Sequence, residues 1–594
     1  MEVKSRAKVM AEILKKQGSG HAPDSYFKEK PVQNEKFMLR GYLYRKLVRP
    51  VQQLKALGRA GQFLNLQQRD VSTFPKFAIS PSKSFSHLMP KESVKMKSMM
   101  YPLIRPYAYA HIKANIADES LLYTVIEPQL TERENAIFEK LKEGLMQIID
   151  ISFDDISEQE KMMDYLEKNV RNLIEEYGFV ISDKEYLKIM YFISRDFVGL
   201  NEIEPLLNDP YIEDLGCDGV NIPLYIVHQR YGSIKTSIIF KDETYLKDFV
   251  TKLAERCDRY ISYAEPLLDG TLPSGSRVQA SLASDVTTRG PTFSIRKFRE
   301  SPFTPADMIN FNTASVDMLA YLWFAVENGS NILIAGGVAT GKTSFLNTLS
   351  MFIDEEAKIV SIEDTRELTL PHQNWIPGVA RAGFSGASVG EISMFDLLKE
   401  SFRQNPDYLI VGEIRGKEAY VMFQAMASGH PSIATIHAGS MDDVMKRLST
   451  EPINISPGLL DVLDLIVVMI HARDKGKSAR RVKEIAELES VDSVTGRPRV
   501  TKSFVWLPSE DSFEYRGNSW ILHKISSEKG IPINSVLRDI SKRKVLLKWM
   551  AERNVNNMEE ASRYLQLYKR NPEKLSEVIG ERFDKEDKSG NPGV

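Results

Sequence analysis

The sequence contains little cysteine and no long hydrophobic run. Its 594 residues include only two cysteines, Cys217 and Cys257, which are too few for a four-thiolate zinc site and fit a reducing compartment. The longest apolar run, Leu459 to Ile470, is interrupted by two aspartates, whereas a membrane-spanning helix needs about 20 apolar residues. The first residues, MEVKSRAKVM, lack the apolar stretch of a signal peptide. We therefore expect a cytosolic chain that does not cross the membrane.

The sequence also lacks internal repeats and low-complexity blocks. Hydrophobic residues make up 42% and charged residues 27% of the chain, values that are ordinary for folded globular proteins and exclude wholesale disorder. The length is about four times that of a typical domain of roughly 150 residues. We therefore expect several domains.

Positive charge is concentrated at the N-terminus. The net charge is -2, but residues 1–115 contain 22 Lys+Arg and 7 Asp+Glu, a net of +15, which leaves -17 for the remainder. Within this region, residues 36–64 place leucines near helical spacing beside basic residues, with an interruption at Pro50. Two interpretations stay open: a segment that binds an anionic lipid surface, a nucleic acid or an acidic protein, or a solvated and partly disordered arm.

Changes in pattern along the chain predict five regions. Capping boxes at Thr131/Glu134 and Ser182/Glu185 begin two of the expected helices. Strands with turn signals follow residue 200, then a Pro-bearing linker, and then strands that alternate with helices, which predicts an α/β fold with a mostly parallel sheet. The predicted regions are 1–115, basic and partly disordered or partner-binding; 116–200, helical; 201–303, a smaller α/β domain; 307–475, the parallel α/β domain; and 476–594, a β-hairpin and helical extension.

The strongest motif is a phosphate-binding loop of the form G-x4-G-K-[ST]. A strand, NILIA, precedes it and a helix follows it, so backbone N–H groups and the positive helix end would meet phosphates. In this pattern Lys342 would reach the β- and γ-phosphates and Thr343 would ligate Mg²⁺. The predicted nucleotide-binding residues are Gly336, Gly337, Val338, Ala339, Thr340, Gly341, Lys342, Thr343 and Ser344.

Three later strands end in residues suited to phosphate chemistry. AKIVSIEDT ends in Glu363 and Asp364, DYLIVGEIRG in Glu413, and PSIATIHAGS in His437. Functional groups of such sheets gather at the C-terminal strand ends, where a carboxylate can hold Mg²⁺ or water and an imidazole can sense the γ-phosphate. No N-K-x-D guanine-reading sequence follows the loop, which argues against a GTPase.

These segments together resemble a known family. GGVATGKTS, VSIED, DYLIVGEIRG and SIATIHAGS are similar to the Walker A, aspartate, Walker B and histidine boxes of the type II/IV secretion traffic ATPases. The Gly-Glu end of the third segment separates that family from most P-loop enzymes. LPHQNWIPGVAR and QAMASGHPSIATIHAGS look most like the archaeal branch, whose members drive archaella and archaeal type IV pili. The resemblance covers about residues 120–500.

The resemblance implies a RecA-like P-loop ATPase domain, preceded by a smaller α/β domain, in a six-membered ring with nucleotide between the two domains. It implies ATP with Mg²⁺ held by Thr343 and Glu413, Glu363 or Glu413 as the general base, and His437 as a γ-phosphate sensor. Which glutamate is the base stays open. The implied catalytic set is Glu413, Glu363, Asp364 and His437, with Arg277, Arg296, Arg381 and Arg415 as candidates to neutralise phosphate charge.

We expect a motor that powers pilus, archaellum or secretion-machine assembly at the cytoplasmic membrane face. Its expected partners are a polytopic membrane platform protein, further copies of itself, and anionic lipid through residues 1–115. The alternative is a nucleic-acid motor, such as a helicase-like or conjugation ATPase, although the basic region lacks regularly interleaved aromatic residues for base stacking. A regulatory nucleotide-binding module without turnover is a third reading, and the presence of both Glu363 and Glu413 weighs against it.

Overall fold

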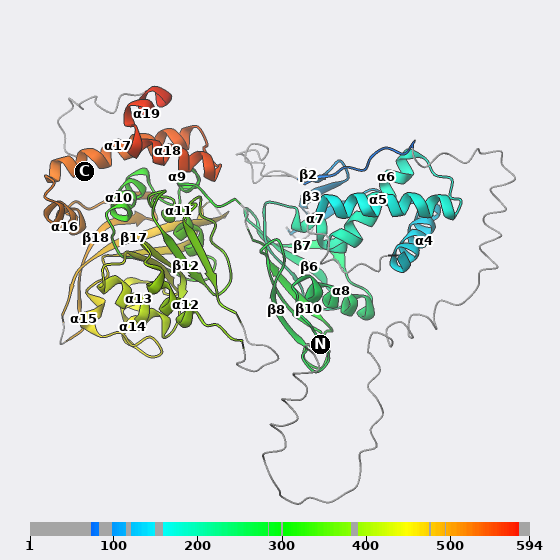
Figure 1. The fold of residues 1–594 in the computed structure, drawn as a ribbon, viewed down its shortest axis with the longest axis horizontal. Helices are drawn as coiled ribbons and strands as arrows, with labels where there is room; N and C mark the ends of the chain where they lie inside the picture. The colour runs from blue at the N-terminus through cyan, green and yellow to red at the C-terminus, as the bar shows by residue number, and fades with distance from the viewer. Residues whose placement is uncertain are drawn as a thin grey trace, which may run out of the picture. The chain divides into compact units, whose positions relative to one another are not determined.

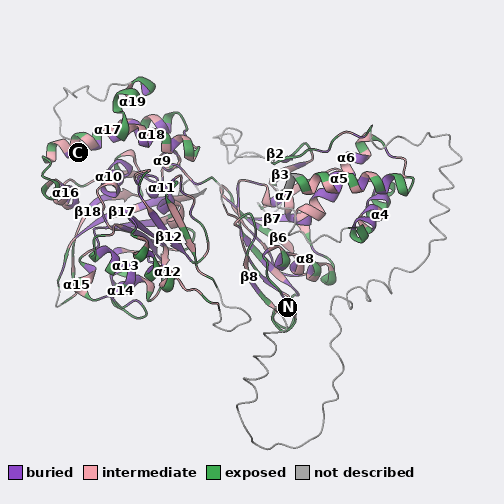
Figure 2. Cartoon of the chain, viewed as in Figure 1, coloured by how far each residue is buried: buried purple, intermediate pink, exposed green. Residues whose placement is uncertain are grey.

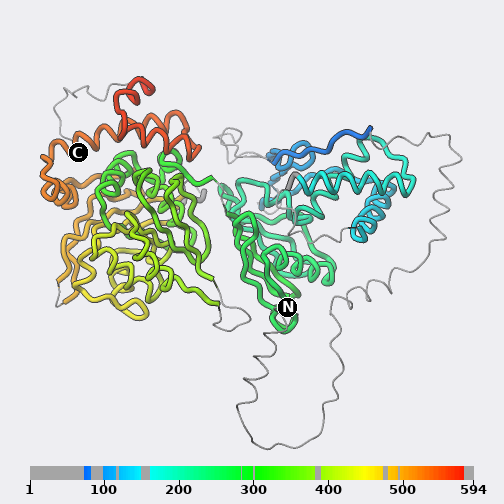
Figure 3. Tube along the Cα trace, in the orientation of Figure 1, coloured from blue at the N-terminus to red at the C-terminus, as the bar shows by residue number. Residues whose placement is uncertain are grey.

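A computed structural model describes residues 73–81, 98–114, 120–148, 159–282, 284–298, 301–381, 390–474, 477–492 and 495–580. The predicted amphipathic segment at residues 36–64 lies outside the described residues. The chain divides into two units, which we describe separately: one contains the described residues up to 75 and residues 136–186, and the other the described residues of 76–135 and 187–594. Figure 3 traces the path of the chain.

The first unit is helical, as the sequence predicts for residues 116–200. That prediction is wrong for residues 121–126, which form a strand of the second unit because they pair with residues 109–114. The first unit contains most of α4 (Glu132–Ile148), α5 (Gln159–Glu176) and the start of α6 (Asp183–Ile193). The predicted capping box at the start of α6 is confirmed, because the Ser182 amide donates to Glu185 at 2.6 Å and the Glu185 amide donates to Ser182 Oγ at 3.4 Å. The Tyr186 ring stacks on Phe74 at 4.5 Å between ring centroids.

The second unit begins with a ten-stranded sheet. Its strand order is β1-β2-β3-β4-β7-β6-β5-β10-β9-β8, and the helix α8 (Glu243–Arg256) buries Leu246, Phe249 and Leu253 beside it. The helix α7 (Glu204–Leu207) precedes β5. The strands are β1 (Ser80–Pro81), β2 (Ser98–Arg105), β3 (Ala108–Ala114), β4 (Leu121–Ile126), β5 (Ile212–Cys217), β6 (Pro223–His228), β7 (Gly232–Ile239), β8 (Leu267–Thr271), β9 (Arg277–Ser281) and β10 (Thr292–Arg296).

The strands β2 and β3 differ from the expectation for residues 1–115. Residues 98–114 form an antiparallel pair within this sheet instead of a partly disordered arm. The physical reason is a period-two pattern that buries Leu103, Ala108 and Ala110 completely. The many basic residues around these strands make the alternation of apolar residues hard to recognise in the sequence.

The second sheet of this unit confirms the predicted parallel α/β fold (Figure 1). Its order is β13-β12-β14-β15-β11-β16-β17-β18-β19; pairs from β13 to β16 are parallel and those beyond β16 are antiparallel. The strands are β11 (Ile332–Gly336), β12 (Ile359–Glu363), β13 (Trp375–Val379), β14 (Tyr408–Ile414), β15 (Ser432–Ile436), β16 (Leu465–Asp474), β17 (Lys477–Val491), β18 (Pro498–Leu507) and β19 (Ser512–Tyr515).

Helices cover both faces of this parallel sheet, and Figure 2 shows buried residues concentrated along its strands. Every residue of β11, β12 and β15 is buried, as expected for parallel strands packed on two sides. The helices are α9 (Pro305–Asn310), α10 (Val316–Glu327), α11 (Lys342–Ser350), α12 (Met394–Ser401), α13 (Glu418–Ala427), α14 (Met441–Ser449) and α15 (Pro457–Leu460). Within the described residues, no helix combines the length and apolarity needed to span a bilayer.

The C-terminal extension is helical, as predicted, and packs onto the parallel domain. It consists of α16 (Trp520–Lys529), α17 (Ile533–Glu552), α18 (Met558–Arg570) and α19 (Pro572–Ile579). The helix α17 lies against α9 and α10, and their apolar residues form one continuous core. Thr304 Oγ1, at the start of α9, donates to the Val555 carbonyl at 2.7 Å.

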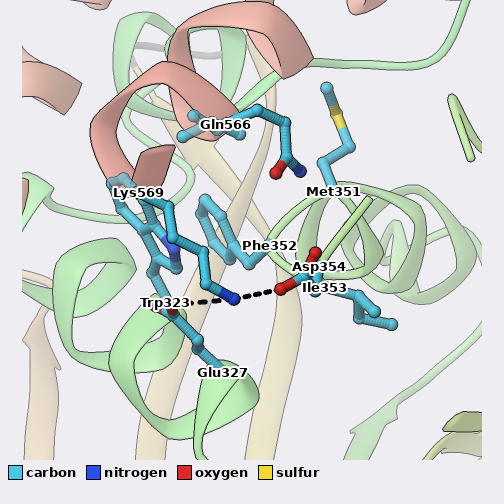
Figure 4. A pocket seen from close by; sticks show the side chains of 9 residues that line it. Trp323, Glu327, Met351, Phe352, Ile353, Asp354, Gln566 and Lys569 are labelled. Atoms are coloured by element: carbon cyan, nitrogen blue, oxygen red, sulfur yellow. Dashed lines mark hydrogen bonds and ion pairs between the residues drawn. The ribbon is translucent and has the colours of Figure 1, made fainter. Parts of the chain in front are cut away.

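Buried Arg543 anchors the extension to α10. The Arg543 guanidinium lies 4.6 Å from the centroid of Trp323 and 5.4 Å from that of Tyr568, and it forms ion pairs with Glu327 at 2.5 Å and Asp539 at 2.8 Å. Figure 4 shows the small pocket beside it, where Lys569 of α18 bridges Glu327 and Asp354. Ion pairs as well as apolar contacts therefore hold the C-terminal extension against the parallel domain.

We expect Arg543→Ala to lower the free energy of unfolding by about 3 kcal/mol, because it removes the buried guanidinium that pairs with two partly buried carboxylates, Glu327 and Asp539. Arg538→Ala, on the exposed side of the same helix, should cost less than about 0.5 kcal/mol. Urea unfolding followed by tryptophan fluorescence measures both. Equal losses for the two variants would contradict the anchoring role of Arg543.

Candidate functional site

The predicted phosphate-binding loop is the connection between β11 and α11. β11 ends at Gly336 and α11 begins at Lys342, so the loop has the strand–loop–helix context that the sequence predicts. Two of its residues adopt left-handed backbone conformations, Ala339 with φ of 58° and Gly341 with φ of 88°. The loop thus turns back on itself immediately before the helix.

Close contacts explain why the loop begins with glycine. A Cβ on Gly336 would lie 2.9 Å from the Met469 carbonyl oxygen and 2.4 Å from Thr340 Oγ1, so no side chain fits there. Thr340 Oγ1 donates to the Gly337 carbonyl at 3.0 Å, and Lys342 Nζ donates to the same carbonyl at 2.9 Å. The lysine side chain therefore folds back over the loop.

The N-terminus of α11 is suited to an anion. Gly341 caps it without a side-chain hydrogen bond, and its first turn contains no acidic residue, so the first N–H groups and the positive helix end are directed at the loop. Burial lowers the pKa of Lys342, although the charges of Glu413 and Glu367 oppose that shift. A negatively charged phosphate chain would relieve the electrostatic cost of burying this lysine.

Glu363 is a buried carboxyl group at the end of β12. It is 2% exposed. Its Oε1 accepts hydrogen bonds from the amides of Glu367 at 2.8 Å and Leu368 at 3.0 Å, while Oε2 is buried without a hydrogen-bond partner. Burial raises the pKa of Glu363 to about 7 in spite of these bonds. A carboxyl group with this pKa can take up a proton near neutral pH.

Glu413 lies on the neighbouring strand β14 in the opposite electrostatic setting. Burial by itself would raise the pKa of Glu413. A hydrogen bond from Arg415 at 2.7 Å outweighs this effect, together with the charges of Arg415, Lys342 and His437, so the pKa of Glu413 is lowered. The pairing of β14 with β15 shifts register between Val411 and Ile414, and such an irregularity redirects a side chain at a strand end. Glu413 therefore stays ionised near the lysine of the loop.

Gly412 makes room for Glu363 between the two strands. A Cβ on Gly412 would lie 3.1 Å from Cγ of Glu363, tighter than an ordinary contact. The Gly412 carbonyl accepts a hydrogen bond from Thr435 Oγ1 of β15 at 2.6 Å. The Gly-Glu sequence at this strand end thus accommodates one carboxylate and supplies the other.

The structure brings several of the remaining predicted residues together. Arg415 bridges Glu413 and Asp364, at 2.7 Å and 3.5 Å, and His437 directly follows β15, close enough for its charge to act on Glu413. The loop, both glutamates, Asp364, Arg415 and His437 therefore occupy one edge of the parallel sheet.

The other predicted arginines are held by carboxylates or backbone. Arg277 pairs with Asp269 at 2.9 Å, and this hydrogen bond, followed by the charges of Asp269 and Asp364, raises the pKa of Arg277. Arg296 pairs with Asp214 at 3.0 Å, and the Glu367 charge also acts on it. Arg381 lies two residues beyond β13 and donates to the Gly390 carbonyl at 2.9 Å. Arg277 and Arg296 thus experience the charges of the acidic strand end.

Two further residues, Arg480 and Asn347, contact the site although no sequence motif includes them. Arg480, on β17, donates from Nε to the Ala339 carbonyl of the loop at 3.1 Å. Asn347, on α11, accepts a hydrogen bond from the Thr369 amide at 3.0 Å and so ties α11 to the segment after Glu363. The position of Asn347 one helical turn after Thr343 was a usable signal. No local pattern marks Arg480, because its strand returns to the loop only through tertiary structure.

The described residues contain no cluster of three or more His, Cys, Asp or Glu side chains placed to hold a metal ion by themselves. Both cysteines are buried free thiols, and burial raises the pKa of Cys217 to about 11 and of Cys257 to about 12. Thiols that are this hard to ionise are inert. Neither thiol is therefore suited to act as a nucleophile or a metal ligand.

Comparisons with known proteins identify related sequences. A family model described as "Type II/IV secretion system protein" matches residues 223–501. The protein MJ0900 of the archaeon Methanocaldococcus jannaschii is 35% identical over 492 residues, which are 78% of this chain and 86% of that protein. The type IV secretion system protein PtlH of Bordetella pertussis is 33% identical over 273 residues, covering 40% of this chain and 79% of PtlH.

Solved structures are also similar to this chain. One is the crystal structure of the VirB11 ATPase from the Brucella suis type IV secretion system in complex with sulphate. The match covers 48% of this chain and 95% of the VirB11 chain. Its sequence identity is 24% and its TM-score is 0.25.

The raised pKa of Glu363 predicts a pH-dependent stability. Glu363 binds a proton with a pKa of about 7 in the folded state and about 4.3 in the unfolded state. Its favourable contribution to the free energy of unfolding is therefore complete below the unfolded pKa and is lost as the pH rises through 7. Glu363→Gln removes this titration. The free energy of unfolding of the variant, relative to that of wild type, should therefore increase by about 3 kcal/mol between pH 4 and pH 8.

Urea unfolding at several pH values measures this difference, with Glu552→Gln, an exposed position, as the matched control. The control should differ from wild type by the same amount at every pH. A Glu363→Gln difference that does not change with pH would contradict the shifted pKa.

Proposed function

Because this chain belongs to the type II/IV secretion system protein family, we propose that it is an ATP-hydrolysing motor that powers assembly of an archaeal-type pilus or archaellum, or of a related secretion machine. One observation carries the proposal: two carboxyl groups with oppositely shifted pKa values stand at adjacent strand ends, on the sheet edge where the phosphate-binding loop lies. That combination serves hydrolysis as well as binding.

The loop binds the phosphates of ATP. Its backbone N–H groups and the start of α11 face the phosphate oxygens, and Lys342 exchanges its bond to the Gly337 carbonyl for the β- and γ-phosphates. The side chains of Val338 and Ala339 contribute nothing to this contact, because backbone groups bind the anion. Thr340 holds the shape of the loop, and Thr343 and Ser344 present hydroxyl groups in the first turn of α11.

The two glutamates take different roles in water attack. Glu363, whose pKa lies near neutrality, accepts the proton of the attacking water. Glu413, whose pKa is lowered, remains anionic and orients the water or the metal. His437 and Arg415 stand beside Glu413, so a change at the γ-phosphate changes the charge balance of all three groups.

The residues present fit a bound Mg²⁺. The Thr343 hydroxyl and the Glu413 carboxylate would supply the hard oxygen ligands that this ion prefers, and the lowered pKa of Glu413 keeps its carboxylate charged. When bound with ATP, the ion neutralises phosphate charge. Arg415 pairs with Glu413, and Asp364 pairs with Arg415.

We propose that the motor is a homohexamer at the cytoplasmic face of the membrane, acting on a polytopic platform protein. Arg277 and Arg296, from the N-terminal sheet, and Arg381 and Arg415, from the parallel domain, neutralise phosphate charge within or between subunits. The linker at residues 301–305 acts as the hinge between residues 201–303 and 307–475. Residues 1–115 contact anionic lipid or an acidic loop of the platform.

A nucleic-acid motor remains the alternative class, and no observation on the described residues favours it. ATP turnover stimulated by single-stranded DNA would favour that class, whereas stimulation by membranes containing the platform protein would favour the motor.

We expect purified full-length protein to hydrolyse ATP in the presence of Mg²⁺. Lys342→Ala should lower the rate by at least about 100-fold, because it removes the cation that stabilises phosphate charge. Glu413→Gln should bind ATP without turning it over, since a neutral amide cannot balance the metal charge. Phosphate release and binding of a fluorescent ATP analogue measure both effects, with Lys529→Ala, at an exposed position, as control. Wild-type turnover in Lys342→Ala would refute the assignment of the site.

We also expect six subunits in the presence of nucleotide. Light scattering with a non-hydrolysable ATP analogue should give a mass six times the 67.5 kDa of one chain. A monomer with full activity would contradict sites that are shared between subunits.

A further inference from the structure

Arg480 contacts the phosphate-binding loop from a strand that none of the four motifs includes. It lies on β17, opposite His471 of β16, and its side chain reaches the loop at the end of β11. Its Nε donates to the Ala339 carbonyl at 3.1 Å, and its Nη2 donates to Glu213 of β5 at 2.8 Å. One guanidinium thus joins the loop to a carboxylate of the N-terminal sheet.

The contact falls at a strained point of the loop. Ala339 has a left-handed backbone conformation, which is unfavourable for a residue that has a Cβ. The stem of Arg480 packs on the next turn, since a Cβ on Gly341 would lie 3.2 Å from its Cδ. Arg480 therefore fixes the carbonyl of the strained residue and packs against Gly341, the residue that caps α11.

Glu213 is held firmly enough to act as an anchor. It sits where the pairing of β5 with β6 shifts register, between Ile212 and Asp214, and its carbonyl accepts a hydrogen bond from the Lys297 amide at 2.9 Å. The next residue, Asp214, pairs with Arg296. Consecutive carboxylates of β5 thus hold one arginine from the P-loop domain and one from the N-terminal sheet.

The Arg480–Glu213 pair is partly withdrawn from water, with side-chain exposures of 25% and 32%. Such a pair is screened less than a fully exposed one. The planar guanidinium presents donors in two directions at once, which suits it to bind a carbonyl and a carboxylate together. A lysine ammonium in its place could not hold both partners in this fixed geometry.

We propose that Arg480 is a positioning residue that couples the N-terminal sheet to the shape of the phosphate-binding loop. With Glu213 in contact, Arg480 holds the Ala339 carbonyl and keeps the loop N–H groups directed at the phosphates. When the N-terminal sheet moves away, the guanidinium loses its anchor and the loop loses that support. The inference rests on the ATP-hydrolysing function proposed above and assigns Arg480 an action through the loop.

The test is a double-mutant cycle in the full-length chain with Mg²⁺ and ATP. The variants are Arg480→Ala, Arg480→Lys, Glu213→Gln and the double variant Arg480→Ala/Glu213→Gln. Arg499→Ala is the matched control, because Arg499 also pairs with a glutamate of β17 but is 79% exposed and lies opposite Ser490, near the other end of that strand. Steady-state kinetics gives KM and kcat, and thermal unfolding reports whether each variant folds.

We expect Arg480→Ala to raise KM for ATP about ten-fold and to change kcat by less than about two-fold, since loss of one charge-assisted bond weakens positioning for binding. Glu213→Gln should raise KM about three-fold, and Arg480→Lys should lie between wild type and Arg480→Ala. The double variant should be no worse than Arg480→Ala, because both residues act through one contact. Arg499→Ala should match wild type.

A wild-type KM in folded Arg480→Ala would overturn the proposal, and so would a double variant whose KM change is the product of the two single changes. If Arg480→Ala fails to fold, Arg480→Lys and Glu213→Gln still decide the outcome. A wild-type protein that binds a fluorescent ATP analogue but hydrolyses no ATP would refute the proposed function instead. In that case the affinity of the same analogue across the cycle tests Arg480 independently.

Discussion

The parallel pairing of β12, β14, β15 and β11 is the constraint on which the site depends. Parallel strands end at the same edge of a sheet, so residues separated by as much as 100 positions in sequence become neighbours without any loop having to bring them together. Glu363, Glu413 and His437 stand at or next to the ends of three of these strands, and the phosphate-binding loop follows the fourth. An antiparallel strand in this set would send its functional residue to the opposite edge.

Differences in environment separate two carboxylates of the same type. Glu363 has amide donors on only one oxygen and lies in a buried position, so its pKa rises. Glu413 shares its surroundings with three cationic or ionisable groups, so its pKa falls although burial opposes the shift. The residue types are identical, and the packing around Gly412 and the position of Arg415 assign them different chemistry.

The helix α11 links the site to the rest of the second unit. Its first turn belongs to the phosphate-binding loop, and Thr348 in its body donates to the carbonyl of Phe303, in the segment that leads into α9, at 2.9 Å. Just beyond its end, the Ile353 carbonyl contacts His372 at 3.1 Å and Asp354 pairs with Lys569 of α18. A displacement of α11 on nucleotide binding would therefore also shift the linker and the C-terminal helices that contact it, because packed elements transmit strain.

The sequence by itself determined the fold class, the loop and the order of the strand-end residues, because periodicity, glycine spacing and motif order are local properties of the chain. The capping boxes and the C-terminal helices were predictable for the same reason. Only the tertiary structure decided that residues 98–114 pair as strands, that Glu363 is buried while Glu413 stays ionised beside Arg415, and that Arg480 reaches Ala339. Those outcomes depend on which surfaces meet and how much water they exclude, and no local pattern encodes that information.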